Sequence, residues 1–116
     1  MFLPEFEYFA PTTVAEALSL LETYGEKAKI LAGGTDLLLI MKDKLLGPEV
    51  LVDISELKAL QGIQHVPGQG LIIGAATKID SIQQSTTVRR HWRALAQAAG
   101  ELGSVQVRSM ATLGGE

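Results

Sequence analysis

Apolar residues in the first quarter of the chain recur at helical spacing. Positions 13–16 have the form of a capping box, and apolar residues over 14–24 fall three and four positions apart. Gly25 is expected to end this helix, and Pro11 prevents the helix from extending further toward the N-terminus. The pattern predicts an amphipathic helix over 14–24, preceded by an extended segment that contains Phe6, Tyr8 and Phe9.

The next segment is predicted to form a strand, a glycine turn, a helix and a second strand. A short apolar run at 29–32 opens into Gly33-Gly34-Thr35-Asp36, after which apolar residues recur at helical spacing to 47–48. Val50, Val52 and Ile54 then alternate with other residues, which predicts a strand buried mainly on one face.

The second half predicts a hairpin followed by helices. Residues 62–66 and 71–75 flank a turn with two glycines, which favours a hairpin. Asp80 or Ser81 is expected to cap a short helix toward Thr87. Apolar positions over 88–102, including Trp92, share one face and predict a continuous helix. Strands alternating with helices, without a repeat or linker, indicate α+β or α/β packing.

Composition narrows the possible partners. The chain has 116 residues, 47% of them apolar, with 10 basic and 13 acidic side chains. A formal charge of -3 does not favour nucleic acid or an acidic membrane surface. The longest apolar run, 37–41, is far shorter than the roughly 20 residues of a bilayer span. No export signal is visible at the acidic N-terminus, so a cytoplasmic location is expected.

Other residue types argue against metal chemistry. Without cysteine the chain has no disulfide, thiolate zinc site or iron-sulfur cluster of its own. His65 and His91 have no sequence neighbours at metal-ligand spacing, so no metal site is expected. Trp92 is expected in the core. The nearby arginines are expected on a solvated helix surface or, less often, in contact with an acidic partner; they are Arg89, Arg90 and Arg93.

The candidate chemistry lies in two glycine turns, at 33–34 and 114–115. A diphosphate needs several converging backbone N–H donors without a side chain in the way, and glycine pairs at helix starts provide them. Thr35 adds a hydroxyl, while the carboxylate of Asp36 is expected to cap the next helix. Taken alone, such a turn is more often a tight connection. It is neither a Walker loop nor a Rossmann fingerprint.

Two longer segments resemble one family. Residues 30–38, Ile-Leu-Ala-Gly-Gly-Thr-Asp-Leu-Leu, are similar to the first flavin loop of the FAD-binding subunits or domains of molybdenum hydroxylases, the xanthine dehydrogenase and carbon monoxide dehydrogenase group. Residues 107–115, Val-Arg-Ser-Met-Ala-Thr-Leu-Gly-Gly, resemble the second loop. Segments 6–13, 51–57 and 72–77 agree in order and separation, so the resemblance covers essentially the whole chain.

The resemblance implies an α+β fold, the N-terminal part of an FAD-binding domain of the vanillyl-alcohol-oxidase (PCMH) type. Residues 1–57 would form the first subdomain and 58–116 the start of the second, with the C-terminal remainder absent. The family's two loops lie at the FAD diphosphate. They carry over to two sets of cofactor-binding residues: Ala32, Gly33, Gly34, Thr35 and Asp36, and Ala111, Thr112, Leu113, Gly114 and Gly115.

Some matching positions have a less direct role. Arg108 fits either phosphate neutralisation or a structural hydrogen bond. Ala76 and Thr77 are expected as second-rank residues lining the flavin cleft. The family usually has Asn where this chain has Glu116, which puts that contact in doubt. Because glycine turns normally connect two elements, we expect further sequence after 115.

By resemblance the complete protein is an oxidoreductase component without catalytic side chains of its own. It would bind FAD, receive electrons from an iron-sulfur subunit that drains a molybdenum-binding subunit, and pass them to NAD or another acceptor. The clusters and the molybdopterin would belong to these partners. Two alternatives are a standalone flavin oxidase or dehydrogenase of the same fold, and a non-catalytic binding or assembly module.

Overall fold

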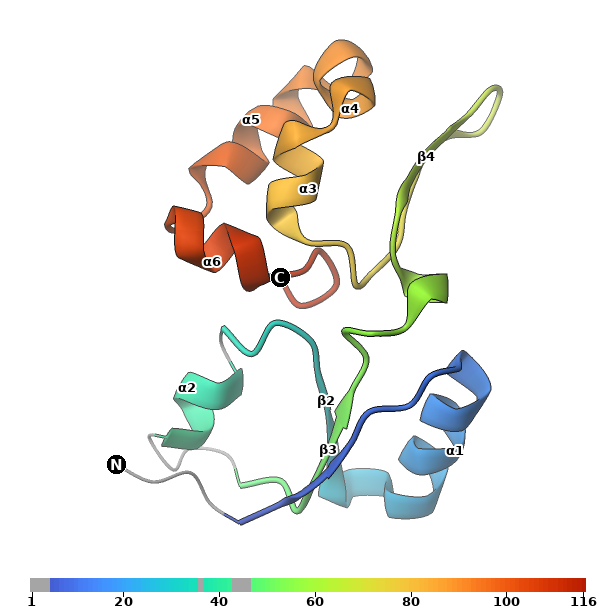
Figure 1. Ribbon diagram of the computed structural model, residues 1–116, viewed down its shortest axis with the longest axis vertical. Helices are drawn as coiled ribbons and strands as arrows, with labels where there is room; N and C mark the ends of the chain where they lie inside the picture. The colour runs from blue at the N-terminus through green and yellow to red at the C-terminus, as the bar shows by residue number, and fades with distance from the viewer. Residues whose placement is uncertain (1–4, 36, 43–46) are drawn as a thin grey trace. The chain divides into compact units, whose positions relative to one another are not determined.

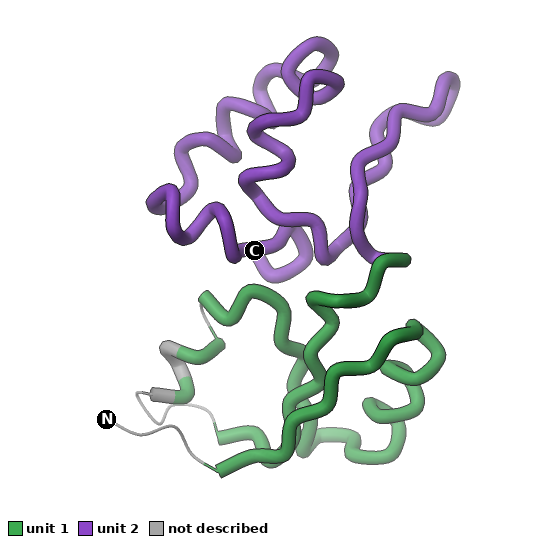
Figure 2. Tube along the Cα trace, viewed as in Figure 1, with its two compact units in different colours: residues 1–59 green, residues 60–116 purple. Residues whose placement is uncertain are grey.

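The computed structural model describes residues 5–35, 37–42 and 47–116. The chain divides into two compact units, Met1–Ala59 and Leu60–Glu116 (Figure 2). No helix within the described ranges is long and apolar enough to span a bilayer.

Unit 1 is built on a parallel sheet of three short strands in the order β1-β3-β2. The strands are β1 (Glu7–Phe9), β2 (Ala28–Leu31) and β3 (Val50–Asp53). All four residues of β3 are buried, so the expectation of a strand buried mainly on one face is wrong. The reason is the central position of β3, between two strands and with helices on opposite sides of the sheet (Figure 1).

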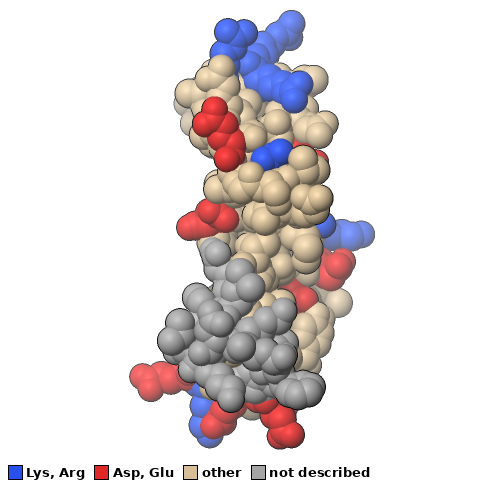
Figure 3. Space-filling model, turned by 90° about the vertical axis from the view of Figure 1, so that its left-hand side faces the viewer, with Lys and Arg blue, Asp and Glu red and all other residues tan. Residues whose placement is uncertain are grey.

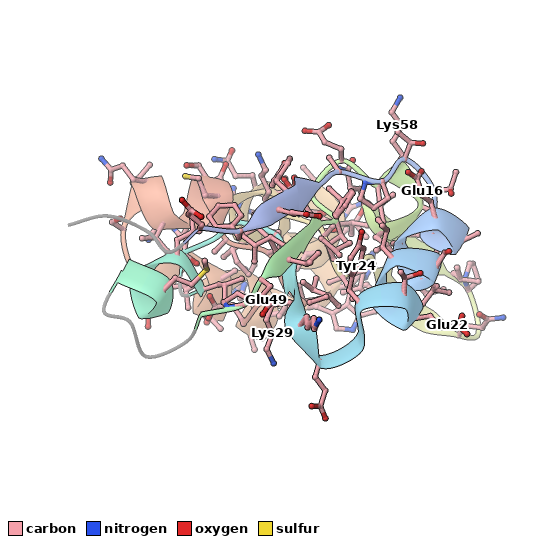
Figure 4. All side chains as sticks on the ribbon, turned by 90° about the horizontal axis from the view of Figure 1, so that it is seen from below. Glu16, Glu22, Tyr24, Lys29, Glu49 and Lys58 are labelled. Carbon is pink, nitrogen blue, oxygen red and sulfur yellow. The ribbon has the colours of Figure 1, made fainter. Side chains whose placement is uncertain are left out.

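Helix α1 (Val14–Tyr24) confirms the predicted element and its caps. The Thr13 hydroxyl accepts a hydrogen bond from the Glu16 N–H at 3.1 Å, and Gly25 ends the helix with φ 52°. A 3-10 turn, Gly25–Lys27, leads into β2. Tyr24 lies between α1 and the sheet, where its ring stacks on Phe9 at 5.5 Å (Figure 4).

The predicted apolar face of α1 is only partly covered. Ala17 is buried, whereas Leu18 is 61% exposed. A sheet of three short strands covers a narrow stripe of a helix, so the outer apolar positions of this face remain accessible.

Helix α2 (Leu37–Lys42) packs on the other side of the sheet. Met41 and Leu51 are fully buried there beside Leu31. The predicted helix extends beyond Lys42 to Leu45, but residues 43–46 lie outside the described ranges. A second 3-10 turn, Lys58–Leu60, follows β3.

Unit 2 begins with the predicted hairpin. Strands β4 (Ile63–Val66) and β5 (Gly70–Ile73) pair antiparallel, with His65 opposite Leu71 and Ile63 opposite Ile73. Paired residues share a face, and Ile63, Leu71 and Ile73 pack against the helical core.

Four short helices complete unit 2: α3 (Ile79–Gln84), α4 (Thr86–His91), α5 (Arg93–Glu101) and α6 (Val105–Met110). The core they enclose consists of Ile79, Ile82, Val88, Ala96, Ala99 and Ala111. Trp92 packs against it, as expected.

Two helix predictions are corrected, and one helix was not predicted. The helix expected over 88–102 is broken at Trp92, whose backbone leaves the helical region so that α4 and α5 diverge. Neither Asp80 nor Ser81 caps α3, which already begins at Ile79, and Ser85 caps α4 instead. Helix α6 was not predicted, although Ser104 caps it through the Val107 N–H.

Candidate functional site

The first glycine turn, residues 32–35, connects β2 to α2 in unit 1. The ladder ends just before it, where the Ile54 N–H donates to the Leu31 carbonyl at 2.9 Å. After it, the Leu38 N–H donates to the Gly34 carbonyl at 3.3 Å. Between these bonds, the N–H groups of Ala32, Gly33, Gly34 and Thr35 donate to no described residue. Four successive backbone donors are therefore available to a ligand.

Gly34 has a conformational and a steric reason to be glycine. Its φ is +75°, and a Cβ there would lie 2.8 Å from Cδ1 of Leu38. A side chain at this position would be strained and would press on the apolar start of α2. Side-chain-free backbone with unbonded N–H groups fits an approaching diphosphate. The expected cap at Asp36 lies outside the described residues.

The second glycine turn, in unit 2, differs because its N–H groups are largely bonded within the unit. The N–H of Leu113 donates to Thr77 at 2.9 Å and that of Gly114 to Ala75 at 2.8 Å. The Ala111 N–H closes the last turn of α6, and the Gly115 N–H donates to the Thr112 hydroxyl at 3.3 Å. The prediction that both turns offer free amides is thus wrong for most of this one.

Thr112 is the exception in the second turn. It forms an antiparallel bridge with Lys78, while the flanking bonds are made by Ala111 and Leu113. Residues at such a position direct their N–H to the outer edge of the pair. The N–H of Thr112 has no acceptor among the described residues.

The second glycine pair also has a packing role. A Cβ on Gly114 would lie 2.8 Å from Cβ of Ala75 and 3.0 Å from its carbonyl oxygen. The backbone of the turn therefore lies directly on the segment that follows β5. This close approach explains Gly114 without any ligand.

Two residues expected to line the cleft are interior. Ala76 is 3% and Thr77 5% exposed. The Thr77 hydroxyl accepts from the Gly62 N–H at 2.9 Å and donates to the Gly62 carbonyl at 3.1 Å. Their expected place as lining residues is corrected: both belong to the internal scaffold of unit 2.

Arg108 makes the structural hydrogen bonds that were one of its two predicted roles. Its Nη1 donates to the carbonyls of Leu102 at 3.0 Å and Gly103 at 3.4 Å, tying α6 to the end of α5. Its Nε is buried and has no partner in the described part of the chain.

A contact that the sequence did not predict joins the edge and the centre of the unit 1 sheet. The Tyr8 hydroxyl donates to Asp53 Oδ2, and Asp53 Oδ1 accepts from the Ser55 N–H at 2.9 Å. The hydrogen bond to Asp53, then desolvation and the negative charges of Asp53 and Glu56, raise the pKa of Tyr8 above 10.0. The parallel register pairs Tyr8 with Leu51, and Asp53 lies two positions farther along β3 on the same face. Knowing this strand pairing would therefore have predicted the contact.

The rings of His65, His91 and Trp92 form a cluster in unit 2. Their centroids are 4.9–5.7 Å apart, with both histidines edge-on or nearly so to Trp92. Among the residues that the structure describes, no three metal-ligating side chains gather as a metal site would require.

Basic side chains gather at the end of unit 2 that carries α4 (Figure 3). A shallow groove of about 590 Å³ lies nearby and is lined by Gln83, Arg89, Arg93, Ala96, Gln97, Gly100 and Glu101. Neither glycine turn lines this groove, so it does not coincide with the predicted binding residues.

Comparison with known proteins shows the family of the chain. Residues 4–116 match the family described as FAD binding domain in molybdopterin dehydrogenase. The nicotinate dehydrogenase FAD-subunit of Eubacterium barkeri is 40% identical over 97% of this chain and 38% of its own length. The carbon monoxide dehydrogenase medium chain of Hydrogenophaga pseudoflava is 41% identical over 100% of this chain and 40% of its own length.

A solved structure gives the same relation. Carbon monoxide dehydrogenase from Hydrogenophaga pseudoflava, in a form that lacks the Mo-pyranopterin moiety, matches with a TM-score of 0.95 and 42% identity. The match covers 99% of this chain and 40% of that one, so the chain spans about two fifths of these relatives. The α+β fold, the N-terminal part of a PCMH-type FAD domain, is confirmed. The chain belongs to the family of FAD-binding domains of molybdopterin dehydrogenases.

Proposed function

We propose that the chain is the N-terminal part of an FAD-binding electron-transfer subunit of a molybdenum hydroxylase, and that the turn at 32–35 binds the diphosphate of FAD. The observation that carries this proposal is the row of unbonded N–H groups beside Gly33 and Gly34. The family match over residues 4–116 supports FAD as the ligand rather than another anion.

The first turn supplies most of the binding. The N–H groups of Ala32, Gly33, Gly34 and Thr35 donate to phosphate oxygens, and the Thr35 hydroxyl adds a donor. From the sequence alone, Asp36 is proposed as a further residue of this turn. Glycine at 33 and 34 leaves the backbone open to the ligand.

The second turn, Ala111–Gly115, has a different part in the proposal. With the N–H groups of Leu113 and Gly114 bonded internally, it offers the single N–H of Thr112 and exposed backbone at Gly114 and Gly115. It therefore acts as a fixed wall beside the cofactor. FAD would dock against it and gain at most one backbone hydrogen bond there.

The reaction follows from the cofactor. FAD would supply the electron-transfer chemistry, while the residues of this chain would bind and orient it and perform no proton transfer. In the proposed complex the electrons come from an iron-sulfur subunit and a molybdenum-binding subunit in the cytoplasm. They leave to NAD or another acceptor.

The non-catalytic module is retained as a second candidate because one observation favours it. Both Gly114 and the bonded amides of the second turn are explained by internal packing alone. A module of that kind would use its glycine turns only as connections and would bind no flavin.

The visible absorption spectrum of the purified full-length protein separates the two functions. We expect bound flavin in the unsubstituted protein and at least a tenfold weaker affinity for FAD in Gly33→Val, because the new side chain blocks charge-assisted hydrogen bonds worth about 1.5–3 kcal/mol each. Gly47→Val is the matched control, because a Cβ at Gly47 meets no atom of the described residues within 4 Å. A colourless protein, or equal flavin content in Gly33→Val, contradicts the proposal.

A further inference from the structure

The segment after β5 lies between two others and is bonded to both. On one side, the N–H of Gly74 donates to Gly62 and the N–H of Ala76 to Leu60, at 2.9 and 2.8 Å. On the other side, the carbonyls of Ala75 and Thr77 accept from Gly114 and Leu113 of the second turn. The position of the second turn therefore depends on how firmly this middle segment is held.

Both contacts are close enough to exclude side chains. A Cβ on Gly74 would lie 2.2 Å from the Leu60 carbonyl oxygen, and a Cβ on Gly114 would lie 3.0 Å from the Ala75 carbonyl oxygen. The three segments thus meet backbone to backbone. A small shift of the middle segment toward Leu60 or away from it is transmitted to the turn.

Thr77 links the two sides through one residue. Its hydroxyl exchanges two hydrogen bonds with Gly62, accepting from the N–H and donating to the carbonyl. Its own carbonyl accepts from the Leu113 N–H at 2.9 Å, and its N–H donates to Gly74 at 3.1 Å. A hydroxyl has one donor and two acceptor positions, so this arrangement satisfies both backbone groups of Gly62.

We infer that Thr77 is a positioning residue for FAD binding. Its hydroxyl fixes the segment after β5, and the second turn is hydrogen-bonded to this segment. The inference rests on the proposed function for the ligand, but the positioning of the turn is a property of unit 2 alone. Thr77 is 5% exposed and touches no ligand in this account.

The hydroxyl, rather than the bulk of the side chain, is the group that matters. Valine has nearly the same shape but leaves the Gly62 N–H without its partner and removes one of the two donors to the Gly62 carbonyl, which still accepts from the Gly74 N–H. Gly62 is exposed, so water replaces part of the lost bonding and the unit still folds. The middle segment then loosens, and the bonds to Leu113 and Gly114 open more often.

The test compares Thr77→Val with Thr77→Ser in the full-length protein by two measurements. Hydrogen exchange without FAD reports the opening of the Leu113 and Gly114 amides, and flavin titration reports the dissociation constant for FAD. In Thr77→Val we expect about tenfold faster exchange at both amides and about tenfold weaker binding, equivalent to one lost hydrogen bond pair. Thr77→Ser keeps the hydroxyl and is expected within twofold of the unsubstituted protein.

Thr86→Val is the matched control, because Thr86 is exposed on α4 and its hydroxyl bonds to no described residue. Unchanged exchange in Thr77→Val, or a serine variant as impaired as the valine variant, overturns the inference. If the valine variant does not fold, wild-type exchange and binding in Thr77→Ser support the role of the hydroxyl, and loss in both overturns it. An unsubstituted protein without FAD affinity contradicts the proposed function, while the exchange measurement still decides the positioning of the turn.

Discussion

At the scale of single residues, the two glycine pairs have different reasons to be glycine. Gly34 combines a positive φ with a row of unbonded N–H groups, whereas Gly114 is required by the approach of Ala75. The same dipeptide therefore marks an open donor row in one unit and a tight internal contact in the other. Sequence alone does not separate these cases, because the acceptors of the second turn lie more than thirty positions upstream.

Tyr8 provides a prediction of stability. Replacing Tyr8 by Phe removes the hydrogen bond to the buried carboxylate of Asp53. Since Tyr8 is 54% exposed, we expect a loss of only about 0.5–1 kcal/mol in the free energy of unfolding at neutral pH. Urea denaturation measures it, with Tyr24→Phe as control, because the Tyr24 hydroxyl bonds to no described residue.

The pH dependence of this difference follows from the raised pKa of Tyr8. The folded state favours the protonated phenol, so the stabilisation is fully present below the ordinary tyrosine pKa of 10.0 and is lost as pH rises through the folded value. The gap between the unsubstituted protein and Tyr8→Phe should therefore shrink at alkaline pH. A gap that stays constant or widens there contradicts this assignment.

At the scale of elements, short helices in this chain depend on their caps. Thr13→Ala removes the acceptor for the Glu16 N–H at the start of α1, and we expect about 1 kcal/mol lower stability. Thr12→Ala is the matched control, because Thr12 is an exposed neighbour whose backbone N–H, not its hydroxyl, is bonded to Glu16. Equal effects of the two substitutions in thermal or urea unfolding would rule out the cap as the cause.

Elements set by local chemistry were predicted from sequence, and those set by distant contacts were not. The caps of α1 and the turn between β4 and β5 depend on adjacent residues, and both were predicted. The burial of β3 on both faces depends on helices elsewhere in unit 1. The break at Trp92 depends on where α4 and α5 pack, so periodicity continued the helix through it.

The same distinction applies to the candidate site. The donor row at 32–35 follows from a glycine turn between strand and helix, which is a local pattern. The engagement of Leu113 and Gly114 depends on carbonyls of the segment after β5, and Thr77 was accordingly placed in a cleft instead of the scaffold. Resemblance located the second turn correctly in sequence but carried no information on its bonding.

At the scale of the whole molecule, the chain is a family member that spans about two fifths of its relatives. Each unit contains one of the two turns, and the bonding within the units leaves them with unequal numbers of unbonded N–H groups. In the proposed subunit the first turn grips the diphosphate through its N–H groups and the second presents a fixed backbone.

Hydrogen exchange of individual backbone amides in the full-length protein, with and without FAD, tests this division of roles between the two turns. The account predicts that FAD slows exchange at Ala32, Gly33, Gly34 and Thr35 strongly, because these amides have no other described partner. Leu113 and Gly114, already bonded, should change little. Unaltered exchange over 32–35 in flavin-loaded protein would contradict the account.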